Sequence, residues 1–94
     1  MPNWKTEKLK KLARAFLSLR TEDEVLSFLR DVASLEELRE LSNRWQVVLE
    51  LNNGKNYRAI AAEVGLSTAT ITRIAHWLYE GEGGYKLALK RYKK

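Results

Sequence analysis

The residues with the most specific chemistry in this 94-residue chain lie between positions 57 and 74. Two helices that meet at a sharp angle need a small residue where their backbones approach and a glycine at the turn. Ala61 and Gly65 have these types at a suitable spacing. Apolar residues suited to the inner faces of both helices accompany them: Ile60, Val64, Leu66, Ile71 and Ile74. The segment therefore predicts a helix-turn-helix over about residues 56–79.

The outer face of the second helix would carry short side chains and one arginine. The residues on this face are Thr68, Ala69, Thr70, Thr72 and Arg73. Arginine donates two hydrogen bonds to O6 and N7 of guanine, threonine presents a hydroxyl and a methyl group, and short side chains let a helix enter the major groove. The face is typical of a helix that reads DNA bases, although the same spacing also occurs in purely structural helical hairpins.

The residue combinations that catalysis or metal binding requires are missing from the sequence. There is no cysteine, and His76 is the only histidine, with no carboxylate pair at ligand spacing on the same helix. The glycine-rich residues 81–86 lack the spacing of a phosphate-binding loop, and no strand precedes them. No nucleophile has a base beside it. We therefore expect no enzymatic activity, no metal site and no cofactor.

Composition indicates one small domain with a polyanionic partner. The chain is 45% hydrophobic and 31% charged, which predicts one folded domain over residues 1–94. A chain of this size buries only roughly 60–65% of its unfolded surface, so association with a second copy would complete its core. Lysine and arginine number 17 against 12 acidic residues, a net charge of +5 that favours nucleic acid as a partner.

The basic residues gather towards the two ends of the sequence. The net charge is +5 over residues 1–20, −5 over residues 21–50, +1 over residues 51–80 and +4 over residues 81–94. A surface that binds a polyanion must then include residues from the two ends and the third block, unless each block is only a solvated helix face.

No apolar stretch of about 18 residues and no secretory signal pattern occurs, so we expect a cytoplasmic protein without a membrane partner.

Hydrophobic periodicity and capping signals predict six helices. Thr21 with Glu24, and Ser34 with Glu37, match the capping box that opens a helix. The predicted helices cover about residues 4–19, 21–32, 34–51, 57–64, 68–79 and 85–92. Threonine alternates with apolar residues over 68–72 and could form a strand by propensity, but its neighbours continue at helical spacing. The predicted fold class is all-α.

Between about residues 24 and 85 the chain resembles the Trp repressor family, most closely its YerC/YecD branch. Four runs carry the resemblance: residues 41–45 (Leu-Ser-Asn-Arg-Trp), 56–61 (Asn-Tyr-Arg-Ala-Ile-Ala), 65–73 (Gly-Leu-Ser-Thr-Ala-Thr-Ile-Thr-Arg) and 83–85 (Gly-Gly-Tyr). Residues 69–73 stand unchanged in the recognition helix of the Trp repressor itself. This match covers about two thirds of the chain and is far more specific than a generic helix-turn-helix.

The resemblance implies an intertwined homodimer whose two helix-turn-helix heads stand about one DNA turn apart and read a palindromic operator in double-stranded DNA. On this analogy Arg58 would reach a base edge, and Thr68, Ala69, Thr70 and Thr72 would line the groove. Lys55, Asn56 and Ser67 are candidates for phosphate contacts, and Arg73 for a phosphate, a base or an effector. We accordingly expect a transcriptional regulator, with repression as its outcome.

The same resemblance raises the question of whether tryptophan acts as a corepressor of this protein. The Trp repressor holds tryptophan between two arginines, which correspond to Arg44 and Arg73. Where the family repressor has a glycine and a serine after the second arginine, this chain has Ile74 and Trp77, which would occupy the space of the indole. We therefore expect no tryptophan corepressor, and we keep Arg44, Arg73 and Trp77 as a possible effector pocket.

Two alternatives stay open from the sequence. Arg44 follows Glu40 by four residues and Glu37 by seven, so an ordinary ion pair along the helix would explain it without a ligand. The helix pair and the tryptophans could also dock a partner protein, which would make the chain a helical interaction module without sequence-specific DNA binding.

Overall fold

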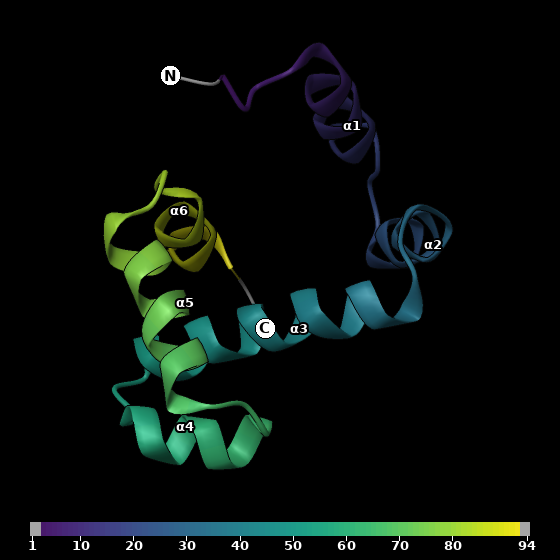
Figure 1. Ribbon diagram of the computed structural model, residues 1–94. Helices are drawn as coiled ribbons and strands as arrows, with labels where there is room; N and C mark the ends of the chain where they lie inside the picture. Colours follow the sequence, from purple (N-terminus) through teal and green to yellow (C-terminus); the bar gives the residue numbers. More distant parts are fainter. Residues whose placement is uncertain (1–2, 93–94) are drawn as a thin grey trace. The chain divides into compact units, whose positions relative to one another are not determined.

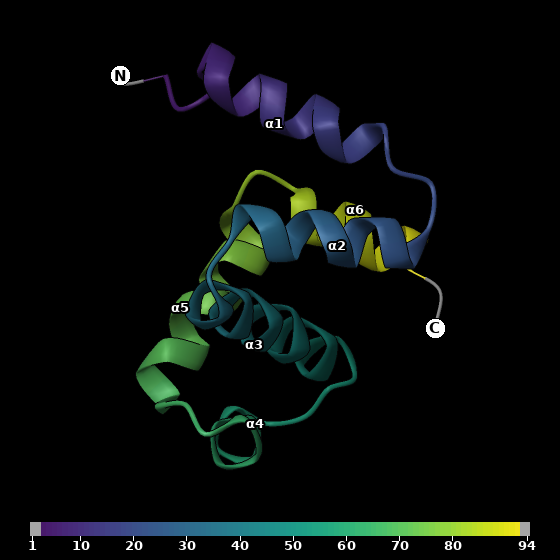
Figure 2. The same cartoon turned by 90° about the vertical axis from the view of Figure 1, so that its right-hand side faces the viewer.

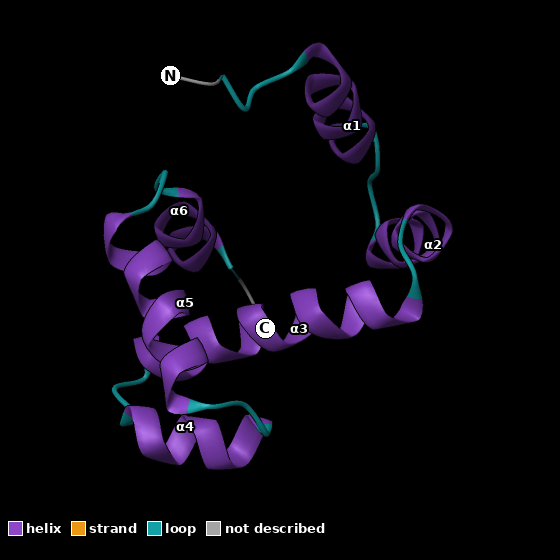
Figure 3. Ribbon diagram, viewed as in Figure 1, coloured by secondary structure: helices purple, strands orange, loops and turns teal. Residues whose placement is uncertain are grey.

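The computed structural model describes residues 3–92, which form six α-helices joined by loops (Figure 1). Their bounds are Glu7–Leu17 for α1, Glu22–Val32 for α2, Leu35–Asn52 for α3, Tyr57–Val64 for α4, Thr68–Glu80 for α5 and Gly84–Arg91 for α6. No strand occurs in residues 3–92, where Figure 3 shows only helices and loops. The prediction of an all-α fold with six helices is confirmed, and residues 68–72 are helical.

Side-chain caps determine where α1, α2, α4 and α5 begin, and Ser34 caps α3 in the same way. Thr6, Thr21, Asn56 and Ser67 precede α1, α2, α4 and α5, and each side-chain oxygen accepts a hydrogen bond from the backbone N–H three residues later. The first helix was predicted to begin near residue 4, but it begins at Glu7, after its cap. Apolar spacing locates the buried face of a helix and not its first turn, which explains the difference.

The predicted capping box at the start of α3 is complete. The Ser34 hydroxyl accepts from the backbone N–H of Glu37 at 3.1 Å, and the Glu37 carboxylate accepts from the backbone N–H of Ser34 at 2.8 Å. These hydrogen bonds lower the pKa of Glu37, the backbone bond most strongly. Before α2 the box is displaced, because the Glu24 carboxylate accepts from the N–H of Arg20, at 2.7 Å, instead of that of Thr21.

The chain divides into two compact units, the first ending at Leu38 and the second beginning at Arg39, so that α3 starts in one and ends in the other. A single domain over residues 1–94 therefore stays a prediction. In the first unit, Phe16 of α1 meets Phe28 of α2 edge to face, with ring centroids 5.1 Å apart. Neither α1 nor α2 contains a fully buried residue.

The second unit holds the hydrophobic core. Its buried residues come from the second half of α3 and from α4 and α5: Val47, Val48, Leu51, Ile60, Ala61, Ile71, Ile74, Ala75 and Leu78. In Figure 1 and Figure 2, α4 and α6 lie at opposite ends of α5. The core thus fixes α4 and α5 on the end of α3.

Aromatic contacts hold α6 against α3. The Trp45 ring stacks on Tyr85 at 6.3 Å between centroids and meets Tyr92 edge to face at 5.4 Å. Trp45, Tyr85 and Leu89 are partly buried and pack against the core, Trp45 as its apolar spacing predicts. None of the helices described between residues 3 and 92 is long and apolar enough to cross a membrane.

Candidate nucleic-acid interface

Three residues, Gly65, Leu66 and Ser67, join α4 to α5. Gly65 has φ 75° and ψ 30°, a left-handed conformation that glycine adopts without steric cost. The N–H groups of Gly65 and Leu66 both donate to the carbonyl oxygen of Ala61, at 2.9 and 3.1 Å. This bonding satisfies the last turn of α4 and turns the chain sharply into α5.

The inner faces of the two helices pack as the apolar spacing predicts. Ile60 and Ile71 are completely buried, Ala61 and Ile74 are buried beside them, and Val64 and Leu66 pack partly buried against this core. Ala61 is 8% exposed and belongs to the core, so a larger side chain at this position would displace its neighbours. The helices α4 and α5 are therefore packed together through a shared buried face, and we call them the α4–α5 pair.

The outer face of α5 is exposed. Thr68, Ala69, Thr72 and Arg73 are exposed, and Thr70 is partly exposed. The Thr72 hydroxyl donates to the carbonyl oxygen of Thr68 at 3.0 Å. Because this bond uses the hydroxyl proton, Thr72 presents a methyl group and oxygen lone pairs to an approaching partner.

Local hydrogen bonds also engage two candidates for phosphate contacts. The Asn56 side chain caps α4 by accepting from the N–H of Ala59 at 2.8 Å. The Ser67 hydroxyl caps α5 by accepting from the N–H of Thr70 at 3.1 Å, and it lies 2.9 Å from the Thr70 hydroxyl. Both caps leave the free N–H groups of a helix N-terminus close by, and such groups favour an anion.

Two arginines of the α4–α5 pair have no ionic partner in the part of the chain that the structure describes. Arg58 lies exposed in the first turn of α4, and Arg73 lies exposed on α5. The ion pairs found within residues 3–92 involve other basic residues, namely Arg14 and Lys55. The two guanidinium groups thus remain available to an outside acceptor.

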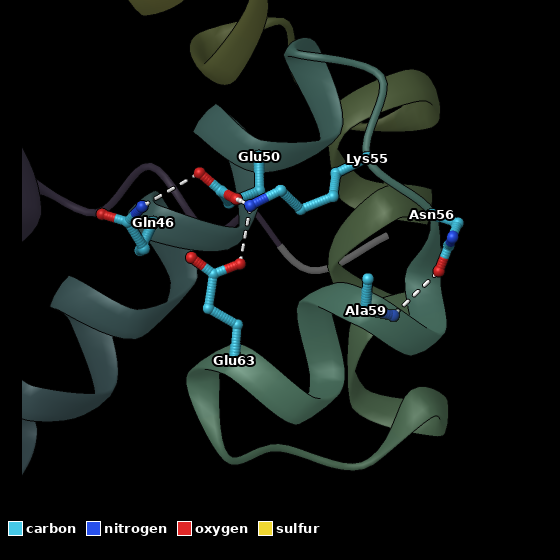
Figure 4. A network of polar contacts seen from close by, with 6 residues as sticks. All are labelled: Gln46, Glu50, Lys55, Asn56, Ala59 and Glu63. Carbon is cyan, nitrogen blue, oxygen red and sulfur yellow. Dashed lines mark hydrogen bonds and ion pairs between the residues drawn. The ribbon is translucent and has the colours of Figure 1, made fainter.

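Lys55 has a different environment (Figure 4). Its ammonium lies 2.7 Å from Oε2 of Glu63 in α4 and forms a second ion pair with Oε2 of Glu50 near the end of α3. The amide of Gln46 donates to Oε1 of Glu50 at 3.3 Å. Hydrogen bonds with Glu50 and Glu63 raise the pKa of Lys55 to about 12, and the bond with Lys55 lowers the pKa of Glu50.

Sequence patterns did not indicate this ion-pair cluster. Glu50, Lys55 and Glu63 are separated by five and eight residues, and a loop interrupts both intervals, so no helical spacing relates them. The sequence shows only that acidic and basic residues alternate around the loop, and this pattern does not specify which side chains contact each other. Lys55 was considered only as a candidate for a phosphate contact.

Two residues considered for an effector pocket, Arg44 and Trp77, line different depressions of the described chain. A pocket of about 250 Å³ is lined by Glu40, Asn43, Arg44, Leu66, Thr70 and Ile74. Neither Arg73 nor Trp77 lines it. Trp77 is 55% exposed and contributes to another depression with Gly81, Glu82, Gly84 and Tyr85.

Two further sequence interpretations concern Arg44 and metal binding. No ion pair joins Arg44 to Glu40 among the residues described, so the simple helical pairing is not formed. Within residues 3–92 no group of three or more histidine, cysteine, aspartate or glutamate side chains is arranged to hold a metal ion.

Comparison with known proteins identifies the family. The family model for the Trp repressor protein matches residues 7–93. The uncharacterised protein YerC of Bacillus subtilis is 35% identical over 88 residues, which cover 94% of this chain and 85% of YerC. A TrpR-like protein from Eubacterium eligens has a crystal structure that matches with a TM-score of 0.85 and 38% identity, over 93% of this chain and 90% of that one.

A candidate Trp repressor from Staphylococcus aureus has a crystal structure that matches with a TM-score of 0.84 and 34% identity, over 93% of this chain and 87% of the other. The family match covers almost the whole chain, including both helices of the α4–α5 pair. Sequence and fold agree, and the chain belongs to the Trp repressor family.

Proposed function

We propose that this protein is a transcriptional regulator, with repression as its outcome, that binds specific sequences in double-stranded DNA through the α4–α5 pair. One observation carries the proposal: α5 has one buried face, and its opposite, exposed face consists of short side chains and Arg73. With Arg58 on α4, two exposed guanidinium groups accompany that face. Arginine and threonine are suited to hydrogen bonding with base edges and phosphates.

Each residue of the interface has a role in the proposal. Arg58 contacts a base edge, and Thr68, Ala69, Thr70 and Thr72 line the major groove. Asn56 and Ser67, together with the helix N-termini that they cap, approach phosphates, and Arg73 contacts a phosphate or a base. A regulator of this kind works on chromosomal DNA in the cytoplasm and needs neither a catalytic centre nor a cofactor.

We further propose that the regulator is a homodimer. Large apolar side chains are exposed on α1, α2 and the first half of α3, and they include Leu9, Leu17, Leu26, Val32, Leu35 and Leu41. Leu17 is 84% exposed and Leu35 is 62% exposed, an arrangement that is costly in water. A second copy would cover these faces and present two α4–α5 pairs to a palindromic operator.

Binding is proposed to be independent of tryptophan. Ile74 lines the pocket beside Arg44 with a branched side chain, at the position where the resemblance implies a glycine. A β-branched side chain fills space that a glycine leaves open. Arg44, Arg73 and Trp77 remain a proposed effector site only if the second copy brings them together.

One observation favours a second candidate function. Trp77 and Tyr79 are both more than half exposed on α5, and exposed aromatic residues are common where proteins bind one another. A helical interaction module would use them to dock a partner protein, without sequence-specific DNA binding.

The test of the proposal is selection from a pool of randomised duplexes by the purified protein, without added tryptophan and near physiological salt. We expect enrichment of a palindrome whose half-sites lie about one helical turn, roughly 10 base pairs, apart. Retention of DNA without a common motif, or no retention at low salt, would contradict the proposal and favour the interaction module.

A further inference from the structure

We propose that Lys55 is a positioning residue that fixes α4 against the end of α3, and that it sets sequence preference through this contact instead of binding a phosphate. This inference rests on the proposed function of the α4–α5 pair. It concerns a cluster of three side chains, Glu50, Lys55 and Glu63, which we call the Lys55 clamp.

The clamp joins three consecutive parts of the fold. Glu50 lies in the last turn of α3, Lys55 in the loop that follows, and Glu63 near the end of α4. The backbone N–H of Lys55 also donates to the carbonyl oxygen of Glu50 at 3.2 Å, which brings the loop back over the end of α3. One ammonium group therefore ties both ends of the loop–α4 segment to α3.

Burial explains why the ammonium stays with the carboxylates. The Glu50 side chain is only 12% exposed, and its Oε2 atom is buried, with Lys55 as its ion-pair partner. If Lys55 moved to a phosphate, this buried carboxylate would lose its counter-charge, which is unfavourable. The second carboxylate, on Glu63, would moreover repel a phosphate placed close to the ammonium.

The clamp bears on DNA recognition because of what α4 carries. Arg58 projects from the first turn of α4, and the turn into α5 follows the last turn of the same helix. A tilt of α4 would move Arg58 relative to the outer face of α5, and base contacts depend on side chains that are held close to their binding geometry. Loss of the clamp is therefore expected to reduce discrimination between sequences more than overall affinity.

The test uses the full chain and the variant Glu63→Gln, which removes the negative charge from one arm of the clamp at a residue whose side chain is 53% exposed. Its matched control is Glu80→Gln, which removes a carboxylate from an exposed residue of α5 that has no ion pair among the residues described. The readout is the specificity ratio, defined as the affinity for the selected duplex divided by that for a scrambled duplex. We expect a roughly three- to tenfold lower ratio for Glu63→Gln and an unchanged ratio for Glu80→Gln.

Salt dependence separates positioning from phosphate contact. If Lys55 bound a phosphate in each copy of the proposed homodimer, Lys55→Gln would make the fall of log affinity with log salt less steep by about 2, one for each copy. The clamp predicts an unchanged slope, a reduced specificity ratio, and restoration of that ratio by Lys55→Arg, which keeps the charge. It also predicts that Lys55→Gln combined with Glu63→Gln lowers the ratio by less than the product of the two single effects.

Hydrogen exchange provides a readout that needs no DNA and that does not depend on the Lys55 variants being stable. Amides of α4 should exchange roughly threefold faster or more in Glu63→Gln than in Glu80→Gln. Equal exchange in the two variants would overturn the proposed role of the clamp. A salt dependence less steep by about 2 in Lys55→Gln, with an unchanged specificity ratio, would overturn it as well. A third outcome is faster exchange in Glu63→Gln than in Glu80→Gln while the wild-type protein shows no sequence preference. This result would overturn the proposed function and, with it, the role of the clamp in recognition.

Discussion

At the scale of single residues, the α4–α5 pair separates side chains with internal partners from side chains without them. Asn56, Ser67 and Thr72 each have a local hydrogen bond, whereas the guanidinium groups of Arg58 and Arg73 have no ion pair within residues 3–92. The hydrogen-bonded side chains define helix ends and side-chain orientation, and the two guanidinium groups are available for recognition.

Arg58→Ala is expected to relax sequence preference at one position of each half-site, because a bidentate contact with a base discriminates by about 1–3 kcal/mol. Arg91→Ala is a matched control that removes the same charge from the end of α6. Fluorescence anisotropy with single-base variants of the selected duplex measures both effects. The control should change the affinity for all duplexes to the same extent. If Arg58→Ala also lowered the affinity for all duplexes equally, a base contact by Arg58 would be contradicted.

The Glu50 carboxylate predicts a pH dependence of stability. Because Lys55 lowers the folded-state pKa of Glu50, the stabilisation is present above the unfolded-state pKa, near the ordinary value of 4.5, and is lost as pH falls through the lower folded-state value. Wild type should therefore unfold at a higher temperature than Glu50→Gln at pH 7, and the difference should shrink below pH 4.5. Thermal unfolding followed by circular dichroism tests this, and a difference that stays constant down to pH 3 would be inconsistent with it.

At the scale of elements, the bend between α4 and α5 depends on the backbone conformation of one residue. Gly65 has a positive φ, and a Cβ atom built there would have no neighbour within 4 Å. The requirement for glycine is thus conformational and does not come from crowding.

Gly65→Ala is therefore expected to destabilise the protein by roughly 1–2 kcal/mol, the cost of holding an alanine in the left-handed region. Gly84→Ala is the matched control, since Gly84 lies in α6 without a positive φ and its added Cβ would also meet open space. This variant should be neutral or slightly stabilising. Denaturant unfolding measures both, and equal stabilities would show that the turn does not need glycine.

The elements were predictable from the sequence because their signals are local. Apolar spacing predicted six helices, and Ala61, Gly65 and the inner-face isoleucines predicted the turn and packing of α4 and α5. The start of α1 was misplaced, because Thr6 and not the apolar pattern defines it. The Lys55 clamp was not predictable, because a loop side chain that turns back to two helices has no periodic signal.

At the scale of the whole molecule, the two units differ in how much apolar surface they bury. The second unit has a core of fully buried side chains, whereas α1 and α2 contain none. The sequence interpretation of a chain too small to complete its core agrees with this difference, and the homodimer is proposed on that basis.

Leu26→Glu is expected to weaken the homodimer, because it places a charge on an apolar side chain of α2 that is 54% exposed in the single chain. Loss of a buried leucine in each copy should raise the dissociation constant roughly tenfold or more. Ser27→Glu adds the same charge at the neighbouring exposed position and should leave the dimer intact. Sedimentation equilibrium distinguishes the two, and identical masses at every concentration would exclude this face from the interface.

The most direct measurement of sequence-specific DNA binding is the specificity ratio of the wild-type protein without added ligand, obtained over a series of salt concentrations. We predict a ratio of about 10³ or more near physiological salt, together with a steep fall of both affinities as salt rises. A ratio close to one at every salt concentration would contradict sequence-specific recognition by the α4–α5 pair, because it would mean that the protein binds only the phosphate backbone.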